Sequence, residues 1–166
     1  MITEKGFDFV ATSFDKADRD GDGYIDHKDF EAMVDSVCQA VGRDPRSPEA
    51  ENVRFQYRQV ADRLIERMDT NSDKQVSKQE YIAGARALQG DPAIVARNTA
   101  AASAMFNLVD VDGDGEISLD EYAKAMGAWG ATKKQVEDDF RAFDKDKNGT
   151  VSLPELMERM QEIYGS

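Results

Sequence analysis

Four short acidic runs recur along this 166-residue chain, and in each run oxygen-bearing side chains stand at every second position. The runs begin at Asp18, Asp69, Asp110 and Asp144, which are separated by 51, 41 and 34 residues. A hard divalent cation takes about six to eight oxygen ligands, and alternate side chains of a tight turn can converge on one such ion. The repeated pattern therefore predicts sites for calcium or a similar cation.

The third and fourth runs meet every requirement of a twelve-residue cation loop. Such a loop uses positions 1, 3, 5, 9 and 12 and the carbonyl of position 7, with glycine at position 6 because the backbone there needs φ > 0. An apolar residue at position 8 anchors the loop to a partner loop. The predicted ligands of the third loop (110–121) and the fourth loop (144–155) are Asp110, Asp112, Asp114, Glu116 through its carbonyl, Ser118 and Glu121, and Asp144, Asp146, Asn148, Thr150 through its carbonyl, Ser152 and Glu155.

The first loop (18–29) has the same pattern with a shorter closing residue. Its predicted ligands are Asp18, Asp20, Asp22, Tyr24 through its carbonyl, Asp26 and Asp29. Because Asp29 is one methylene shorter than glutamate, bidentate closure is harder and the loop must contract. This favours six-coordinate Mg²⁺ or weakens Ca²⁺ binding.

The second loop (69–80) keeps the oxygen donors Asp69, Asn71, Asp73, Ser77 and Glu80 but has Lys74 at position 6. A side chain at φ > 0 costs on the order of 1 kcal/mol, and an ammonium group lies near the cation site. We expect this loop to stay empty and to pair with the first loop, with occupancy only at high calcium as the alternative. The sequence thus predicts about three cation sites.

Helical patterns flank every loop. Apolar residues stand one, four and eight positions before each run, which marks one helical face. Ser77 with Glu80, Ser118 with Glu121 and Ser152 with Glu155 form capping boxes that start the following helices. The sequence predicts an all-α fold of four helix–loop–helix units in two paired lobes, residues 1–89 and 90–166, with short β contacts between paired loops. The lobe boundary is placed at Gly90–Pro92, which breaks any helix.

The charge balance limits the partners. Asp and Glu number 33 against 21 Lys and Arg, giving a net charge of -12 and a pI near 4.5. Such a polyanion is not expected to bind nucleic acid or anionic membrane. No apolar run is long enough to span a bilayer and no apolar leader opens the chain, so we expect a cytoplasmic monomer.

On these loops the chain resembles the EF-hand superfamily over nearly its whole length. Within it, the chain is similar to the sarcoplasmic calcium-binding proteins and their bacterial calerythrin-like members. The residues that carry this resemblance run from Phe14–Asp18 through Asp29–Phe30. The stretched first pair, the damaged second loop and Trp129–Thr132 leading into Val136 and Phe140 also carry it. The resemblance implies a compact four-hand protein that binds Ca²⁺ and Mg²⁺ at loops one, three and four and acts as an intracellular buffer or transporter.

Three functions compete. A buffer is favoured by Asp29 and by the interrupted linker between lobes. The alternative is a calcium sensor that exposes an apolar cleft and binds a target protein helix; it is favoured because related chains often run on past the fourth hand to cover the cleft, whereas this one stops at Ser166. An enzyme is not expected, since His27 is the only histidine and no nucleophile–histidine pair or phosphate loop occurs.

Overall fold

A computed structural model describes residues 13–88 and 91–164 and shows a mostly helical protein. Residues 13–17 are helical and lead into the first loop. The elements that follow are β1 (Tyr24–Ile25), α2 (His27–Val41), α3 (Pro48–Met68), β2 (Val76–Ser77), α4 (Lys78–Leu88), α5 (Pro92–Val109), β3 (Glu116–Ser118), α6 (Leu119–Ala128), α7 (Lys133–Phe143), β4 (Thr150–Ser152) and α8 (Leu153–Tyr164). The predicted all-α fold with four helix–loop–helix units is confirmed.

The loops pair through two short antiparallel sheets. Strand β1 pairs with β2 so that Ile25 lies opposite Val76, and β3 pairs with β4 so that Ile117 lies opposite Val151. These four residues occupy position 8 of their loops, and all four are buried. The predicted β contacts are therefore confirmed, and their apolar side chains fix each loop pair to the core.

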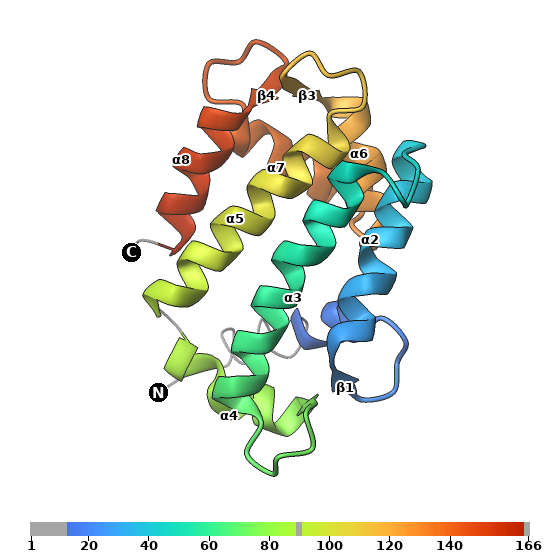
Figure 1. Ribbon diagram of the computed structural model, residues 1–166. Coiled ribbons are helices and arrows are strands. Elements are labelled where there is room, and N and C mark those ends of the chain that lie inside the picture. The colour runs from blue at the N-terminus through green and yellow to red at the C-terminus, as the bar shows by residue number, and fades with distance from the viewer. Residues whose placement is uncertain (1–12, 89–90, 165–166) are drawn as a thin grey trace.

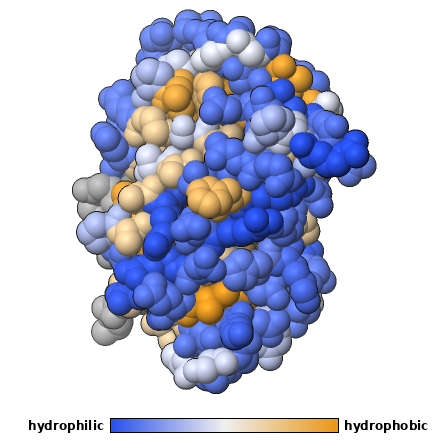
Figure 2. Space-filling model, viewed as in Figure 1, coloured by the Kyte–Doolittle hydropathy of each residue, from blue (hydrophilic) through white to orange (hydrophobic). Residues whose placement is uncertain are grey.

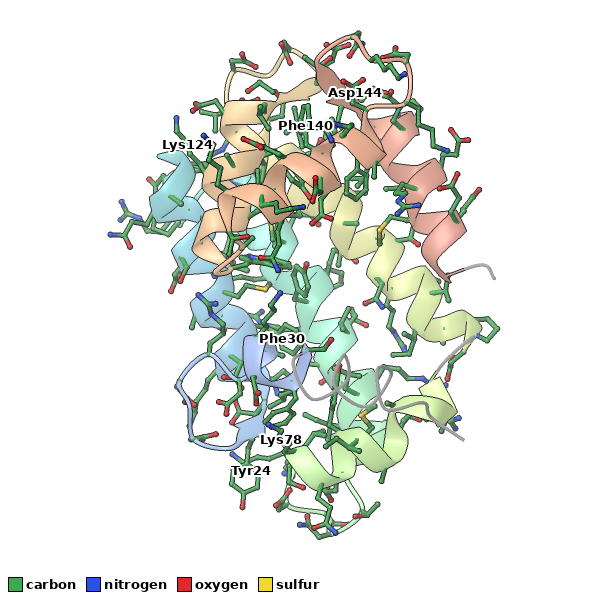
Figure 3. All side chains as sticks on the ribbon, turned by 180° about the vertical axis from the view of Figure 1, so that it is seen from behind. Tyr24, Phe30, Lys78, Lys124, Phe140 and Asp144 are labelled. Carbon is green, nitrogen blue, oxygen red and sulfur yellow. The ribbon has the colours of Figure 1, made fainter. Side chains whose placement is uncertain are left out.

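The two loop pairs lie at opposite ends of the molecule, with α3 and α5 running side by side between them (Figure 1). Tyr24 in the first loop and Asp144 in the fourth accordingly appear at opposite ends in Figure 3. The face shown in Figure 2 is mostly hydrophilic, and its apolar side chains gather in small patches. This surface agrees with the large excess of acidic residues.

Local sequence signals explain where the helices begin and end. Ser47 caps α3 by accepting a hydrogen bond from the Ala50 N–H, and Pro48 occupies the first turn, where no N–H is needed. Asp91 and Pro92 start α5 in the same way. Gly42 ends α2 in the left-handed conformation with φ 76°. The predicted helix break at Pro92 is confirmed, whereas the predicted lobe boundary between residues 89 and 90 lies outside the described residues.

The larger core cluster draws side chains from both halves of the chain. Val34 and Val37 of α2 and Val53 of α3 share it with Leu108 of α5 and Phe140 of α7. A second cluster surrounds the first loop pair, with Phe14, Ile25, Met68, Val76 and Ile94 as its buried members. Because the larger core is common to both halves, moving one half relative to the other would expose apolar side chains of both.

Candidate metal centres

The left-handed turn predicted at position 6 is present in all four loops. Gly23, Gly115 and Gly149 have φ of 89°, 86° and 89°, and Lys74 adopts the same conformation with φ 64°. Glycine populates this region freely, whereas lysine is strained there. The second loop therefore folds like the others in spite of its lysine.

Position 4 of every loop is also left-handed, which sequence reasoning missed. Gly21 and Gly113 have φ of 73° and 72°, while Ser72 and Lys147 have φ of 63° and 60°. Two glycines at this position are a signal that could have revealed the turn. Two such turns in six residues curl the loop, so that its alternate side chains face one centre.

Three loops bring acidic side chains together. In each of three groups, one oxygen of every member lies within 4.8 Å of an oxygen of the others. The groups are Asp18, Asp20 and Asp22; Asp110, Asp112 and Glu121; and Asp144, Asp146 and Glu155. The second loop contributes no group of this kind within residues 13–88 and 91–164. Nine of the predicted acidic ligands therefore lie close together, three in each of the first, third and fourth loops.

In the third loop, backbone N–H groups hold the carboxylates in place. Asp110, at the end of α5, accepts hydrogen bonds from Gly113 at 2.9 Å and Gly115 at 3.0 Å. Glu121 in the first turn of α6 accepts from the N–H of Val111 at 3.1 Å and from that of Ser118 at 2.9 Å. The first and last positions of the loop are thereby drawn to one centre.

The fourth loop repeats this arrangement. Asp144 accepts from the Gly149 N–H at 3.0 Å, and Glu155 accepts from the N–H and hydroxyl of Ser152 at 2.9 and 2.8 Å. The N–H of Ser152 is the largest cause that lowers the pKa of Glu155, since a hydrogen bond to the ionised carboxylate favours it. Glu155 is thus held in the form that binds a cation.

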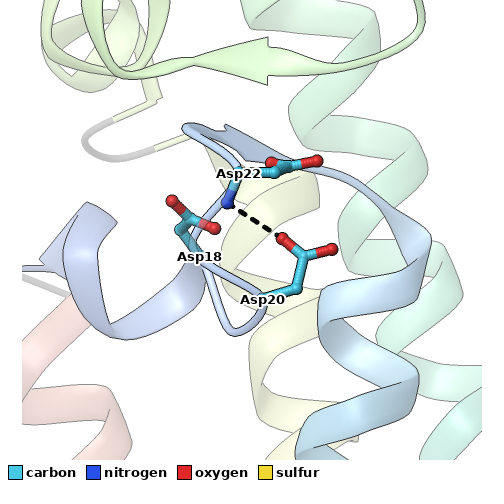
Figure 4. Close-up of side chains that lie close together, drawn as sticks. All are labelled: Asp18, Asp20 and Asp22. Atoms are coloured by element: carbon cyan, nitrogen blue, oxygen red, sulfur yellow. Dashed lines mark hydrogen bonds between the residues drawn. The ribbon is translucent and has the colours of Figure 1, made fainter.

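The first loop closes differently. Its carboxylates Asp18, Asp20 and Asp22 lie close together, and the Asp22 N–H donates to Asp20 at 3.1 Å (Figure 4). Asp29 is only 3% exposed and stays outside this group; it accepts from the N–H groups of Arg19 and Asp26 at 2.8 Å each. Burial raises the pKa of Asp29 in spite of these N–H bonds. The shorter side chain therefore reaches the loop backbone but not the carboxylate cluster.

The second loop is complete as a framework. Asp69 accepts from the N–H groups of Ser72 and Lys74 at 2.7 and 2.8 Å. Glu80 accepts from the N–H groups of Ser77 and Thr70, and these bonds lower its pKa to about 2. The closing glutamate thus already satisfies donors of its own loop.

The remaining predicted ligands lie in the loops, on the strands and at one helix start. Asp114 accepts from the Glu116 N–H at 2.8 Å and is not a member of the acidic group of its loop. Asp26 caps α2 and also accepts from the Gln75 amide of the second loop at 3.1 Å. Tyr24 lies on β1, Glu116 and Ser118 on β3, Asn148 just before β4, and Thr150 and Ser152 on β4. All these donors are oxygen atoms, which fit hard cations such as Ca²⁺ or Mg²⁺.

A largely apolar cavity of ≈ 540 Å³ lies between the two halves. Its lining includes Met126, Trp129 and Met160 from the second half, and Phe30 of α2 from the first. Asp29 and Ile25 of the first loop also line it, so the cavity and the first cation loop share a wall.

Comparison with known families agrees with this geometry. The family model described as an EF-hand domain pair matches residues 7–86, and single EF-hand models match residues 102–128 and 138–160. The chain belongs to the EF-hand family of calcium-binding proteins. Among the helices of the described residues, none is long and apolar enough to cross a membrane.

Relatives within the family follow the resemblance noted from the sequence. The chain is 25% identical to calerythrin of Saccharopolyspora erythraea over 167 residues, covering 99% of this chain and 94% of calerythrin. It is 30% identical to the sarcoplasmic calcium-binding protein beta chain of Penaeus sp. over 161 residues, covering 89% of this chain and 79% of that protein. The solved structure of a Streptomyces coelicolor calcium-binding protein has the same fold, with a TM-score of 0.83, 23% identity and coverage of 95% and 97%.

Proposed function

We propose that this protein is an intracellular calcium buffer or transporter with three working cation sites. The observation that carries the proposal is the convergence of acidic side chains in the first, third and fourth loops. Asp29 favours Mg²⁺ in the first loop, since its short side chain needs a contracted shell. The second loop, with Lys74, serves to pair with the first and stays empty.

The shared core supports buffering over sensing. A sensor hand opens its helix pair on calcium binding, whereas a buffer hand barely opens. Here Val34 and Val37 of α2 share one core cluster with Leu108 and Phe140 of the second half. Opening either half would expose this common apolar surface to water, which costs about 25 cal/mol per Å². We propose a cytoplasmic monomer without catalytic activity, built from hand pairs 1–89 and 90–166.

The apolar cavity favours a second candidate function, a calcium sensor that captures a target helix. Its lining by Met126, Trp129 and Met160 would suit an apolar helix face if calcium widened its mouth. The same fold is found in the S. coelicolor protein, whose structure is described as a basis for prokaryotic calcium-mediated regulation.

Dye binding and solution scattering of the chelated, Mg²⁺-loaded and Ca²⁺-loaded forms test the choice. The buffer predicts that both loaded forms bind a hydrophobic dye weakly and have the same radius of gyration. A large rise in dye fluorescence with Ca²⁺ but not with Mg²⁺ would reject the buffer and support the sensor.

A further inference from the structure

An arginine from the first half caps the helix that leads into the third loop. Arg43, which directly follows the end of α2, donates to the backbone carbonyls of Leu108 at 3.2 Å, Asn107 at 3.1 Å and Asp110 at 2.8 Å. Asn107 and Leu108 lie in the last turn of α5, and Asp110 is its C-cap residue and the first acidic residue of the third loop. One guanidinium thus ties the end of α2 to the start of a cation loop 64 to 67 residues away.

A second arginine links the first loop to the helix that leaves the third loop. Arg19 occupies position 2 of the first loop, and its Nη2 donates to the carbonyl of Ala128 at 2.9 Å. Ala128 is the last residue of α6. The backbone N–H of Arg19 donates to Asp29, the closing residue of the first loop. The end of α6 is therefore held by the first loop itself.

Both contacts are made where a positive group is most useful. The last four carbonyls of a helix lack partners within it, and the helix dipole places partial negative charge there. Arginine can serve several carbonyls at once with its fixed fork of donors, whereas lysine carries a single point charge. Carbonyls at the C-terminal ends of both helices of the third hand, α5 and α6, thus accept hydrogen bonds from arginines of the first half.

We propose that Arg19 and Arg43 are positioning residues that couple the first and third loops across the two halves, so that a cation in one loop raises the affinity of the other. This inference rests on the proposed cation binding at both loops. A cation that orders the first loop also fixes Arg19, and through it the end of α6. The third loop then has less conformational freedom to lose when it binds, which gives positive coupling between the sites.

Terbium luminescence can report the first loop on its own. Terbium stands in for calcium and emits when a nearby tyrosine is excited, and Tyr24 is the only aromatic residue within any of the four loops. Emission that is lost in Tyr24→Phe is assigned to the first loop. Its affinity for terbium is then measured with the third loop intact and with that loop disabled by Glu121→Gln.

In the unaltered chain, we expect Glu121→Gln to lower the first-loop affinity about tenfold, within the usual range of coupling between sites. Two backgrounds remove these contacts: Arg43→Lys keeps the charge but loses the fork that serves three carbonyls, and Arg19→Met loses the donor to Ala128. In both, Glu121→Gln is expected to change the first-loop affinity by no more than about twofold. Arg46→Lys is the matched control, because Arg46 lies in the same connection with its side chain 89% exposed and pairs with Asp44. It should retain the full tenfold effect.

Metal-free protein gives an independent readout. In chelator, Arg43→Lys should lower the urea midpoint and Arg46→Lys should not. The inference would be overturned if Arg43→Lys and Arg46→Lys had equal urea midpoints, or if Glu121→Gln changed the first-loop affinity equally in all backgrounds. Either result would leave cation binding intact. Absence of terbium and calcium binding at the first and third loops would instead overturn the proposed function and this inference together.

Discussion

The second and third loops share their left-handed turns and their pairing contact but differ in the carboxyl groups that they bring together. Position 6 is left-handed in both, at Lys74 and at Gly115, and both loops pair with a neighbour through a short antiparallel contact. Of these two loops, and within the part of the chain that the structure describes, only the third gathers three carboxyl groups. The second loop thus keeps the pairing contact at position 8, although its acidic side chains do not form such a group.

The largest expected effect comes from removing the closing glutamate of a working loop. Glu121→Gln should weaken calcium binding at the third loop on the order of 100-fold, because it removes one ligand charge and bidentate closure. Titration calorimetry should then count two strong sites in place of three. Asp120→Asn is the control, since the exposed Asp120 pairs with Lys124 on the surface. Unchanged affinity and stoichiometry in Glu121→Gln would show that the ligands are assigned wrongly.

The corresponding glutamate of the second loop should matter for folding instead. Glu80 accepts from N–H groups at both ends of its loop, and its pKa falls from 4.5 to about 2. In chelator at pH 7, Glu80→Gln should lower the free energy of unfolding by about 1 to 3 kcal/mol, as measured by urea titration. Glu66→Gln, which removes an exposed ion pair with Arg63, should cost at most about 1 kcal/mol.

The pH dependence of this effect has a definite sign. A carboxyl group whose pKa is lowered on folding stabilises the protein fully above its unfolded pKa, which is 4.5 for Glu80. That stability is lost as the pH falls from 4.5 towards 2. The difference between Glu80→Gln and the unaltered chain should therefore shrink over this interval. A difference that stays constant down to pH 3 would mean that Glu80 acts through packing rather than through its charge.

Much of the structure of the second and third loops could be predicted from the spacing of residues in the sequence. Oxygen donors at fixed positions, an apolar residue at position 8 and the Ser–Glu capping boxes all act within one loop, so a single sequence reveals them. The strained Lys74 was predicted for the same reason, because the loop geometry requires φ > 0 there whatever residue is present.

The contacts between halves could not be predicted in this way. Arg43 and Arg19 donate to backbone carbonyls, and every residue presents a carbonyl, so no sequence pattern marks Asn107 or Ala128 as a partner. The left-handed Ser72 and Lys147 were missed because neither residue favours that conformation by itself. In both cases the surrounding fold, rather than the residue type, determines the geometry.

A smaller effect is expected when the second loop is given the glycine of the third. Lys74→Gly should raise its calcium affinity about tenfold, because it removes a positive charge near the ion and strain on the order of 1 kcal/mol. The fold should gain little, since glycine adds a similar conformational entropy to the unfolded chain. Calorimetry at millimolar calcium should count a fourth site.

Two further variants separate charge from strain at this loop. Lys74→Gln removes the charge and keeps the Cβ, whereas Ser72→Gly relieves the other left-handed position and leaves the charge in place. A fourth site in Lys74→Gln but not in Ser72→Gly would assign the defect to charge. Three sites in Lys74→Gly as well would show that position 6 is not what distinguishes the two loops.

The smallest expected effect concerns the first loop. In its match to the cation-loop pattern, this loop is intermediate between the second and the third. Asp29 accepts from the N–H groups of Arg19 and Asp26, at the same loop positions from which Val111 and Ser118 donate to Glu121. Asp29→Glu should therefore keep these bonds while its carboxylate extends towards the cluster. We expect calcium affinity at this loop to rise about threefold to tenfold, with little change for magnesium, because the longer side chain permits the larger shell that Ca²⁺ prefers. Calcium titrations with and without competing magnesium measure this ratio. An unchanged ratio would mean that the backbone of the first loop, rather than the length of its closing residue, sets the choice of cation.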